Sequence, residues 1–313
     1  MDISDPPARY SGHVVFPFWC VALVILCASA MPAQELEPRA YSVSPVGVNF
    51  VVVAFARASG DLSFDPALPV EDASATLHNV VLGYGRAIDF FGRTANFAVA
   101  VPYTWGSLEG LVNGVSAQGT RSGLGDSVFR LAVNLYGAPA MNLEKFREYR
   151  QKTTIGASVV LIVPTGQYDD NRYVNIGSNR WAVKPEVGFS RRVNRWYFDL
   201  YLGIWVFGTN TDFKGSFRTQ DPLGTTQLHV SYNITRRMWA AFDANYYTGG
   251  RTSTNGVAGA DLQRNSRVGG TLAVPVTKHQ SIKFNYSTGA RTNIGASFQT
   301  IGIGYQYTWG GGV

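Results

Sequence analysis

Strict alternation of large apolar residues with small or polar residues is the feature that most constrains how this chain can fold. Between Thr300 and Trp309, every odd position holds a large apolar or aromatic residue and every even position a small or polar one. A period of two places the two sets on opposite faces of a β-strand. The odd face becomes more aromatic towards the end of the chain. This pattern is typical of membrane barrel strands, which turn apolar residues to lipid and aromatic residues to the interface.

The same stretch resembles the C-terminal signal of bacterial outer-membrane barrels, in which a glycine is followed by two aromatic residues at alternate positions. Gly304, Tyr307 and Trp309 fit that spacing. The tail from Gly310 to Val313 departs from it, because such proteins usually stop at the last aromatic residue. We therefore expect the barrel-assembly machinery to be a partner through this last strand.

Alternating segments recur along the whole chain and are separated by turn residues. An even number places both termini on the same side, where the short connections would be periplasmic and the long ones would face outside. The polar stretch 58–74 and the Gly-rich stretch ending at Gly123 are expected to be long loops, and 141–150 is the only helix-like piece. The twelve expected strands cover residues 48–57, 77–87, 96–103, 126–136, 153–163, 181–191, 196–207, 227–234, 239–247, 267–274, 281–287 and 300–309.

Composition favours a membrane barrel over a soluble sandwich. Only 15% of the residues are charged, against about 25% in typical soluble domains. We predict an all-β fold, a transmembrane antiparallel up-and-down β-barrel of about 12 strands, with a soluble β-protein as the alternative. In the first strand, Val48, Phe50, Val52 and Ala54 are expected on one face and Arg57 on the opposite, inward face. Aromatic residues also gather at strand ends on the apolar face, as interface girdles do: Tyr103, Trp181, Trp196, Tyr246, Tyr307 and Trp309.

The first thirty residues have the pattern of a secretory signal peptide. Val14 to Ala28 is apolar, and Ala28-Ser29-Ala30 is a small-x-small cleavage site. We predict a signal peptide over 1–30 and a barrel domain over 31–313, with an uncleaved anchor as the alternative. The protein would then lie in the outer membrane of a Gram-negative bacterium, in contact with outer-membrane lipids and lipopolysaccharide. Both cysteines, Cys20 and Cys27, lie in this leader, so the mature chain would have no disulfide or thiolate metal site.

Other classes of function have little support in the sequence. The net charge is +6 and the pI about 9.3, but no Lys/Arg-rich run is present, so no nucleic acid is expected. The chain shows no phosphate loop, dinucleotide fingerprint or Cys/His cluster, and we expect no cofactor and no metal. A hydrolase would need a Ser–His pair within hydrogen-bond reach. His229 beside Ser231 is the one candidate, and without a nucleophile elbow we expect no enzyme.

A series of short motifs follows the chain in order. They are Pro45–Phe50, Ser122–Asp126, Pro164–Asp169, Asn175–Trp181, Lys184–Glu186, Gly249–Arg251, Asn265–Gly269, Pro275–Ser281 and Tyr286–Gly289. With these motifs the chain resembles, over nearly all of its mature length, the outer-membrane transporters of the MetA pathway of phenol degradation. The resemblance implies a β-barrel in the outer membrane that passes aromatic or other hydrophobic compounds, and it brings no catalytic residues.

Parity along the strands predicts which side chains face the lumen. The charged set forms either a polar constriction that selects the solute or a network of salt bridges, because ionisable groups in a pore need partners. The aromatic set forms either a lining for an aromatic solute or plain packing. The charged set is Arg57, Asp126, Arg130, Lys184, Glu186, Asp199, His229, Asp243, Arg267 and Lys283, and the aromatic set is Tyr197, Tyr201, Trp205, Phe207 and Tyr247.

Together these features predict a porin-like channel for passive uptake of small hydrophobic or aromatic compounds of the phenol type. The alternative is an occluded barrel that has a structural role or binds a partner through its loops.

Overall fold

The computed structural model describes residues 36–63, 70–112, 114–171 and 175–311, so the expected signal peptide lies outside the described residues. Nearly all of the described chain is antiparallel β-strand. The larger strands are β1 (Val48–Ser63), β2 (Val70–Phe90), β3 (Arg93–Val112), β4 (Val115–Leu124), β5 (Ser127–Tyr136), β6 (Thr153–Val163), β7 (Ala182–Val193), β8 (Trp196–Phe207), β11 (Leu223–Asn233), β12 (Trp239–Gly249), β15 (Gln263–Pro275), β16 (Gln280–Arg291) and β17 (Gly295–Gly310).

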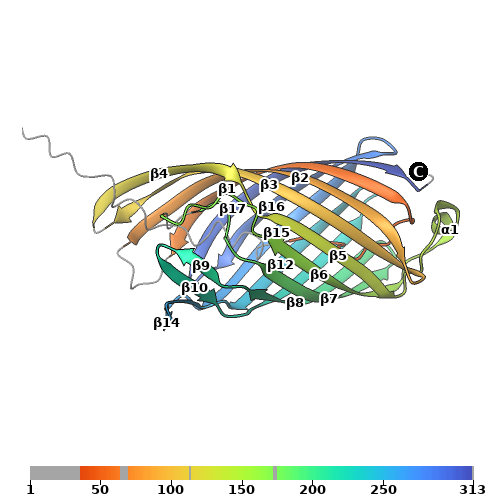
Figure 1. The fold of residues 1–313 in the computed structure, drawn as a ribbon. Coiled ribbons are helices and arrows are strands. Elements are labelled where there is room, and N and C mark those ends of the chain that lie inside the picture. The colour runs from red at the N-terminus through yellow and green to blue at the C-terminus, as the bar shows by residue number, and fades with distance from the viewer. Residues whose placement is uncertain (1–35, 64–69, 113, 172–174, 312–313) are drawn as a thin grey trace, which may run out of the picture.

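These 13 strands form one sheet, in the order β2-β1-β17-β16-β15-β12-β11-β8-β7-β6-β5-β3-β4, and the pairing of β2 with β3 closes it into a barrel (Figure 1). β5 pairs with the first half of β3 and β4 with its second half, so β4 and β5 share one position around the ring. The closed barrel therefore has twelve strand positions, which confirms the predicted architecture. Among the described residues, no helix is long and apolar enough to span a membrane.

Side-chain exposure follows the alternation of the strands. In β17, Ile301, Ile303 and Trp309 are exposed on the outer surface, while Phe298 on the opposite face is buried. β7 shows the same division, with Val187 and Phe189 exposed and Lys184 and Glu186 buried. Large apolar residues thus cover the outside of the barrel, and most polar side chains of the strands point inward.

The first strand faces the other way from the prediction. Val53 and Phe55 are exposed, whereas Val48 is buried. Val53 pairs with Tyr305 of β17, which lies on the outer face, and this register fixes the orientation of all of β1. Arg57 shares the parity of Val53 and is exposed on the outer surface, so its assignment to the lumen was wrong. The sequence is ambiguous here because apolar residues occupy both parities.

Two expected loops are largely strand. β1 continues to Ser63 and β2 begins at Val70, within the stretch 58–74. β3 runs on to Val112 and β4 begins at Val115, within the Gly-rich stretch. These extensions carry mostly small and polar residues on their outer side, so they lack the apolar alternation that marks a lipid-facing strand. Four short strands form a second sheet: β9 (Asn210–Phe213), β10 (Ser216–Gln220), β13 (Thr252–Thr254) and β14 (Val257–Ala258).

The two ends of the barrel differ. Figure 1 shows β4 and the small sheet at one end, and helix α1 (Leu143–Glu148) with the C-terminus at the other. The helix confirms the helix-like piece, and its first turn is capped by Asn142, whose side chain accepts from the backbone N–H of Lys145 at 3.0 Å. Near it, Val43, Ala138 and Met141 form a small buried cluster.

Candidate functional site: the barrel lumen

Residues 36–47, which we call the plug, precede β1 and run inside the barrel. At their C-terminal end the backbone N–H of Gly47 donates to the carbonyl of Ala87 at 2.9 Å, and that of Val46 to the carbonyl of Met141 at 2.8 Å. Further in, the Tyr41 ring lies against the inner surface of β6 and β7. A Cβ at Gly156 or Gly188 would fall 2.2 or 2.1 Å from that ring, so only glycine admits it at these two positions.

Tyr41 is the best-anchored residue of the plug and is 1% exposed. Its hydroxyl donates to Glu186 Oε1 at 3.1 Å and lies 3.1 Å from Ser158 Oγ. Its ring meets that of Tyr201 edge-on at 5.1 Å. Burial, and then the charge of Glu186, raises the pKa of Tyr41 to about 12, so the hydroxyl stays a neutral donor at ordinary pH.

Arg39, two residues before Tyr41, is a second anchor of the plug. Its guanidinium donates to Asn233 Oδ1 at 2.8 Å and lies between two aromatic rings, 4.3 Å from the centroid of Tyr197 and 4.4 Å from that of Trp239. Burial lowers its pKa to about 10, which still leaves it positively charged at neutral pH. The neighbouring backbone N–H of Ala40 donates to the hydroxyl of Tyr201 at 3.1 Å. Tyr197 and Tyr201 of the predicted aromatic set are therefore covered by the plug.

A buried ion network lies beneath Tyr41. Glu186 pairs with Lys184 at 3.1 Å and with Arg130 at 3.9 Å, and Gln227 donates to it at 3.2 Å. Arg130 also reaches Glu37 of the plug at 3.8 Å. Three of the predicted lumen charges thus come together here, and one charged residue that sequence reasoning missed joins them.

A second polar group crosses β8, β11, β12 and β15. His229 Nδ1 lies 2.7 Å from Asp243 Oδ1, and Thr271 donates to Asp243 Oδ2 at 2.7 Å. Asp199 is 3% exposed and pairs with His229 across the β8–β11 ladder. Ser231 Oγ and His229 Nε2 both lack a hydrogen-bond partner, so the two do not bond to each other. The arrangement does not assemble the Ser–His pair that a hydrolase needs.

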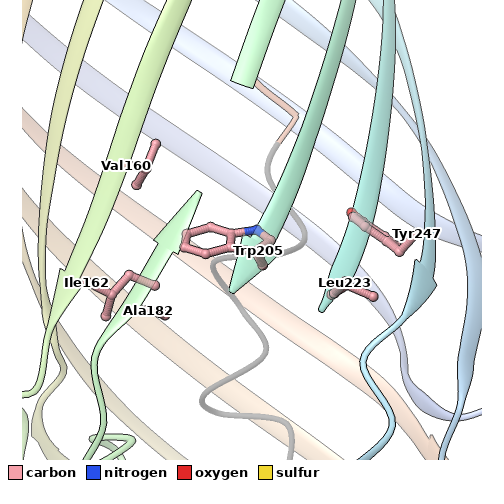
Figure 2. Close-up of a cluster of buried hydrophobic side chains, with 6 residues drawn as sticks. All are labelled: Val160, Ile162, Ala182, Trp205, Leu223 and Tyr247. Carbon is pink, nitrogen blue, oxygen red and sulfur yellow. The ribbon is translucent and has the colours of Figure 1, made fainter. Parts of the chain in front are cut away.

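The remaining aromatic residues of the predicted set form a separate buried cluster. Figure 2 shows Trp205 between side chains from neighbouring strands, with Tyr247 on one side and Ile162 on the other. Phe207 packs against this cluster and stacks on Trp205 at 6.3 Å. Cations lie over both rings, since Lys184 Nζ is 5.3 Å from the centroid of Trp205 and Arg180 is 4.7 Å from that of Phe207. The cluster is Val160, Ile162, Ala182, Trp205, Leu223 and Tyr247.

Three predicted lumen residues lie apart from these groups. Arg267 of β15 is 3% exposed and donates to Ser287 Oγ at 3.0 Å. Lys283 of β16 is half-buried with the inward parity. Asp126 lies at the junction of β4 and β5, where it accepts from the backbone N–H groups of Gly166 and Ser178 at 2.9 and 2.8 Å. Asp126 therefore fastens the connection between β6 and β7.

Sequence reasoning missed the plug, which supplies Glu37, Arg39 and Tyr41. Residues 36–47 show no period of two and have no helical pattern. One usable signal was present: the barrel strands carry glycines at Gly156 and Gly188 on the inward face, where a close approach by another segment needs space. Within the part of the chain that the structure describes, no group of three or more His, Cys, Asp or Glu residues could hold a metal ion.

Comparisons with known proteins agree with this architecture. Residues 71–308 match the model of a family described as "Putative MetA-pathway of phenol degradation". No curated protein matches the sequence. Among solved structures, an outer-membrane channel from Pseudomonas putida F1 is similar with a TM-score of 0.75 and 21% identity, over 88% of this chain and 100% of that chain. The transport unit of the autotransporter AIDA-I from Escherichia coli is similar with a TM-score of 0.53 and 10% identity, over 90% of this chain and 97% of that chain.

Proposed function

Because this chain belongs to the family of the MetA pathway of phenol degradation, we propose that it is an outer-membrane channel for passive uptake of small hydrophobic or aromatic compounds. Outer-membrane lipids and lipopolysaccharide would cover its apolar outer surface. The barrel-assembly machinery would recognise β17, the last strand.

One observation carries the proposal: the lumen contains a buried apolar and aromatic cluster around Trp205. The interior of a general porin is polar and filled with water. The free energy of binding becomes more favourable by about 25 cal/mol for each Å² of apolar solute surface that an apolar wall removes from water. Ring stacking adds to this contribution. Such a wall favours an aromatic solute over a sugar or an ion.

Uptake of a labelled phenol into proteoliposomes tests the proposal. Trp205→Ala removes the largest side chain of the cluster and should change the rate of uptake severalfold, while Trp181→Ala serves as the matched control. Trp181 is a residue of the same type that is 53% exposed on the outer side of the barrel. Equal rates for the wild type and Trp205→Ala would mean that the cluster is not on the path of the solute.

The plug favours a second candidate, an occluded barrel with a structural role. Tyr41, Arg39 and Glu37 fix it to the wall through hydrogen bonds, ring contacts and an ion pair. A channel requires either that a solute passes beside the plug or that the plug shifts. Planar-bilayer recordings, together with phenol flux, distinguish the two: an occluded barrel gives neither current steps nor flux.

A further inference from the structure

Arg267 is a buried cation whose hydrogen-bonding capacity is only partly used. It lies in β15, is 3% exposed, and through Nη2 donates to Ser287 Oγ at 3.0 Å and to Thr300 Oγ1 at 3.4 Å. Its Nε and Nη1 atoms are buried and have no acceptor. A buried donor without an acceptor is costly, and the cost is greater when the donor is charged. An acceptor from outside the chain would remove it.

A cavity of about 130 Å³ lies beside this guanidinium, which is several times the ~30 Å³ that one water molecule occupies in the liquid. Most of its wall is polar, and the plug residue Leu36 covers one side. Two inward glycines leave space for side chains of this wall: a Cβ on Gly269 would fall 2.9 Å from Leu36 Cδ1, and one on Gly302 would fall 2.5 Å from Asn285 Oδ1. The polar side chains of the wall are Asp243, Arg267, Thr271, Asn285, Ser287 and Thr300.

Among the described residues, the guanidinium of Arg267 forms no direct ion pair with a carboxylate. Asp243 is the only acidic residue in the wall of the cavity, and both of its oxygens are engaged, Oδ1 with His229 and Oδ2 with Thr271, each at 2.7 Å. In the described ranges, no Asp or Glu lies within ion-pair distance of Arg267. By contrast, Lys184 has a carboxylate partner at 3.1 Å. The cavity therefore has room for an acceptor, and Nε and Nη1 of Arg267 are buried donors that Asp243 does not engage.

Arg267, in the wall of the cavity, is also near one member of the aromatic cluster, Tyr247, which does not itself line the cavity. Arg267 pairs with Asn245 across the β15–β12 ladder, and Tyr247 of the cluster is two residues further along β12 on the same face. Residues two apart on one face of a strand are about 7 Å apart. A small ring placed against Tyr247 would thus have Arg267 within reach of a substituent on it.

From these contacts we propose that the Arg267 cavity binds the carboxylate of a small aromatic acid, whose ring lies against the neighbouring apolar cluster. This inference rests on the proposed function and narrows it from aromatic compounds in general to aromatic acids. The guanidinium supplies charge-assisted hydrogen bonds from Nε and Nη1, and Asn285 supplies an amide. The polar cavity sets the orientation and the apolar cluster provides the contact area.

Calorimetric titration of the detergent-purified full chain with benzoate tests the site. The wild type should bind benzoate more tightly than benzyl alcohol, which has the same ring and no charge. Arg267→Met should weaken benzoate binding roughly tenfold to a hundredfold, the usual effect of losing a hydrogen bond to a charged group, and should leave benzyl alcohol unchanged. Arg264→Met is the matched control, because Arg264 is on the same strand but is exposed on the opposite face.

Arg267→Lys covers the case in which the methionine variant fails to fold. Lysine keeps the positive charge but lacks the planar fork of donors of a guanidinium. This variant should therefore retain part of the affinity for benzoate and should still prefer benzoate to benzyl alcohol. A heat-dependent shift of the band on a gel shows whether each variant forms a closed barrel. If a folded Arg267→Met or Arg267→Lys barrel binds benzoate as the wild type does, or if the wild type binds none, the cavity holds water only and the inference is overturned.

Failure of the proposed channel function would give a different result from failure of the acid-binding site. If the channel function fails, proteoliposomes take up benzyl alcohol and benzoate no faster than protein-free vesicles do, although the purified barrel still binds benzoate through Arg267. Uptake of both compounds that is insensitive to Arg267→Met would instead retain the channel and reject the acid-binding cavity.

Discussion

At the scale of single residues, Glu186 is where the polar contacts of the lumen converge. It is 5% exposed and meets Tyr41 of the plug, Lys184 on its own strand and Gln227 on β11. Removing one member of a buried ion pair leaves the other charge without compensation, which costs more than the pair itself contributes. Glu186→Gln should therefore lower the free energy of unfolding by about 3 kcal/mol, measured by urea denaturation in detergent.

The matched control for this change is Glu109→Gln. Glu109 carries the same charge on β3 but is exposed, so its loss should change the free energy of unfolding by less than about 0.5 kcal/mol. Equal effects of the two substitutions would show that the ion network of the lumen does not stabilise the barrel.

Tyr41 gives the plug a dependence on alkaline pH. Burial raises its pKa to about 12 from the ordinary value of 10.0. Between these two values the undocked plug loses the proton and the docked plug keeps it, so docking weakens as the pH rises from 10 to 12. The loss amounts to roughly 2 kcal/mol. Hydrogen exchange of the plug amides should accelerate over this range in the wild type relative to Tyr41→Phe, and an identical pH response of the two would contradict the assignment.

At the scale of elements, the plug is the segment that lies inside the barrel against its inner wall. Tyr41 and Arg39 attach it to β6, β7, β8 and β11 by side-chain contacts, and within the described chain the plug forms no strand. Deleting residues 36–43 leaves β1 intact and empties this part of the lumen. The deletion should raise single-channel conductance severalfold in planar bilayers, whereas an unchanged conductance would mean that the narrowest point is formed by the barrel wall or the loops.

At the end of the barrel opposite helix α1, one carboxylate helps to fasten the connection between β6 and β7. Asp126 accepts backbone N–H groups from Gly166 and Ser178, two points far apart in that connection. An asparagine keeps the shape but replaces one acceptor oxygen with a donor, so one of these bonds is lost. Asp126→Asn should make residues 164–181 more sensitive to limited proteolysis. Asp221→Asn, an exposed change in another connection, should leave the cleavage rate as it is in the wild type.

At the scale of the whole molecule, the barrel could be predicted from the sequence because the alternation that defines its strands is a local pattern. In β7 from Val183 to Phe189, and in β17 from Ile301 to Trp309, an apolar or aromatic residue stands at every second position, so strand, face and lipid contact follow from the same pattern. In β1, Val51 to Val53 are apolar on both faces, and only pairing with β17 fixes the orientation. Local alternation alone cannot indicate which face of such a strand is the outer one.

The plug could not be predicted for a different reason. Tyr41 reaches Glu186 across 145 positions of the chain, and Ser158 across 117. Contacts of this kind depend on the closed shape of the barrel. The sequence of residues 36–47 has no periodicity from which these contacts could be predicted. Parity placed Tyr201 and Trp205 on the same inward face. The structure separates them, because the plug covers Tyr201 while Trp205 belongs to the apolar cluster.

Flux of phenol into proteoliposomes that contain the purified full chain is the most direct test of the central claim, that the lumen is a path for small aromatic molecules. Vesicles with the native barrel should take up phenol faster than vesicles containing the same protein in its heat-unfolded form. Uptake of a disaccharide should remain at the level of empty vesicles. If native and unfolded protein gave the same phenol flux, or if the disaccharide entered as readily as phenol, the account would be contradicted.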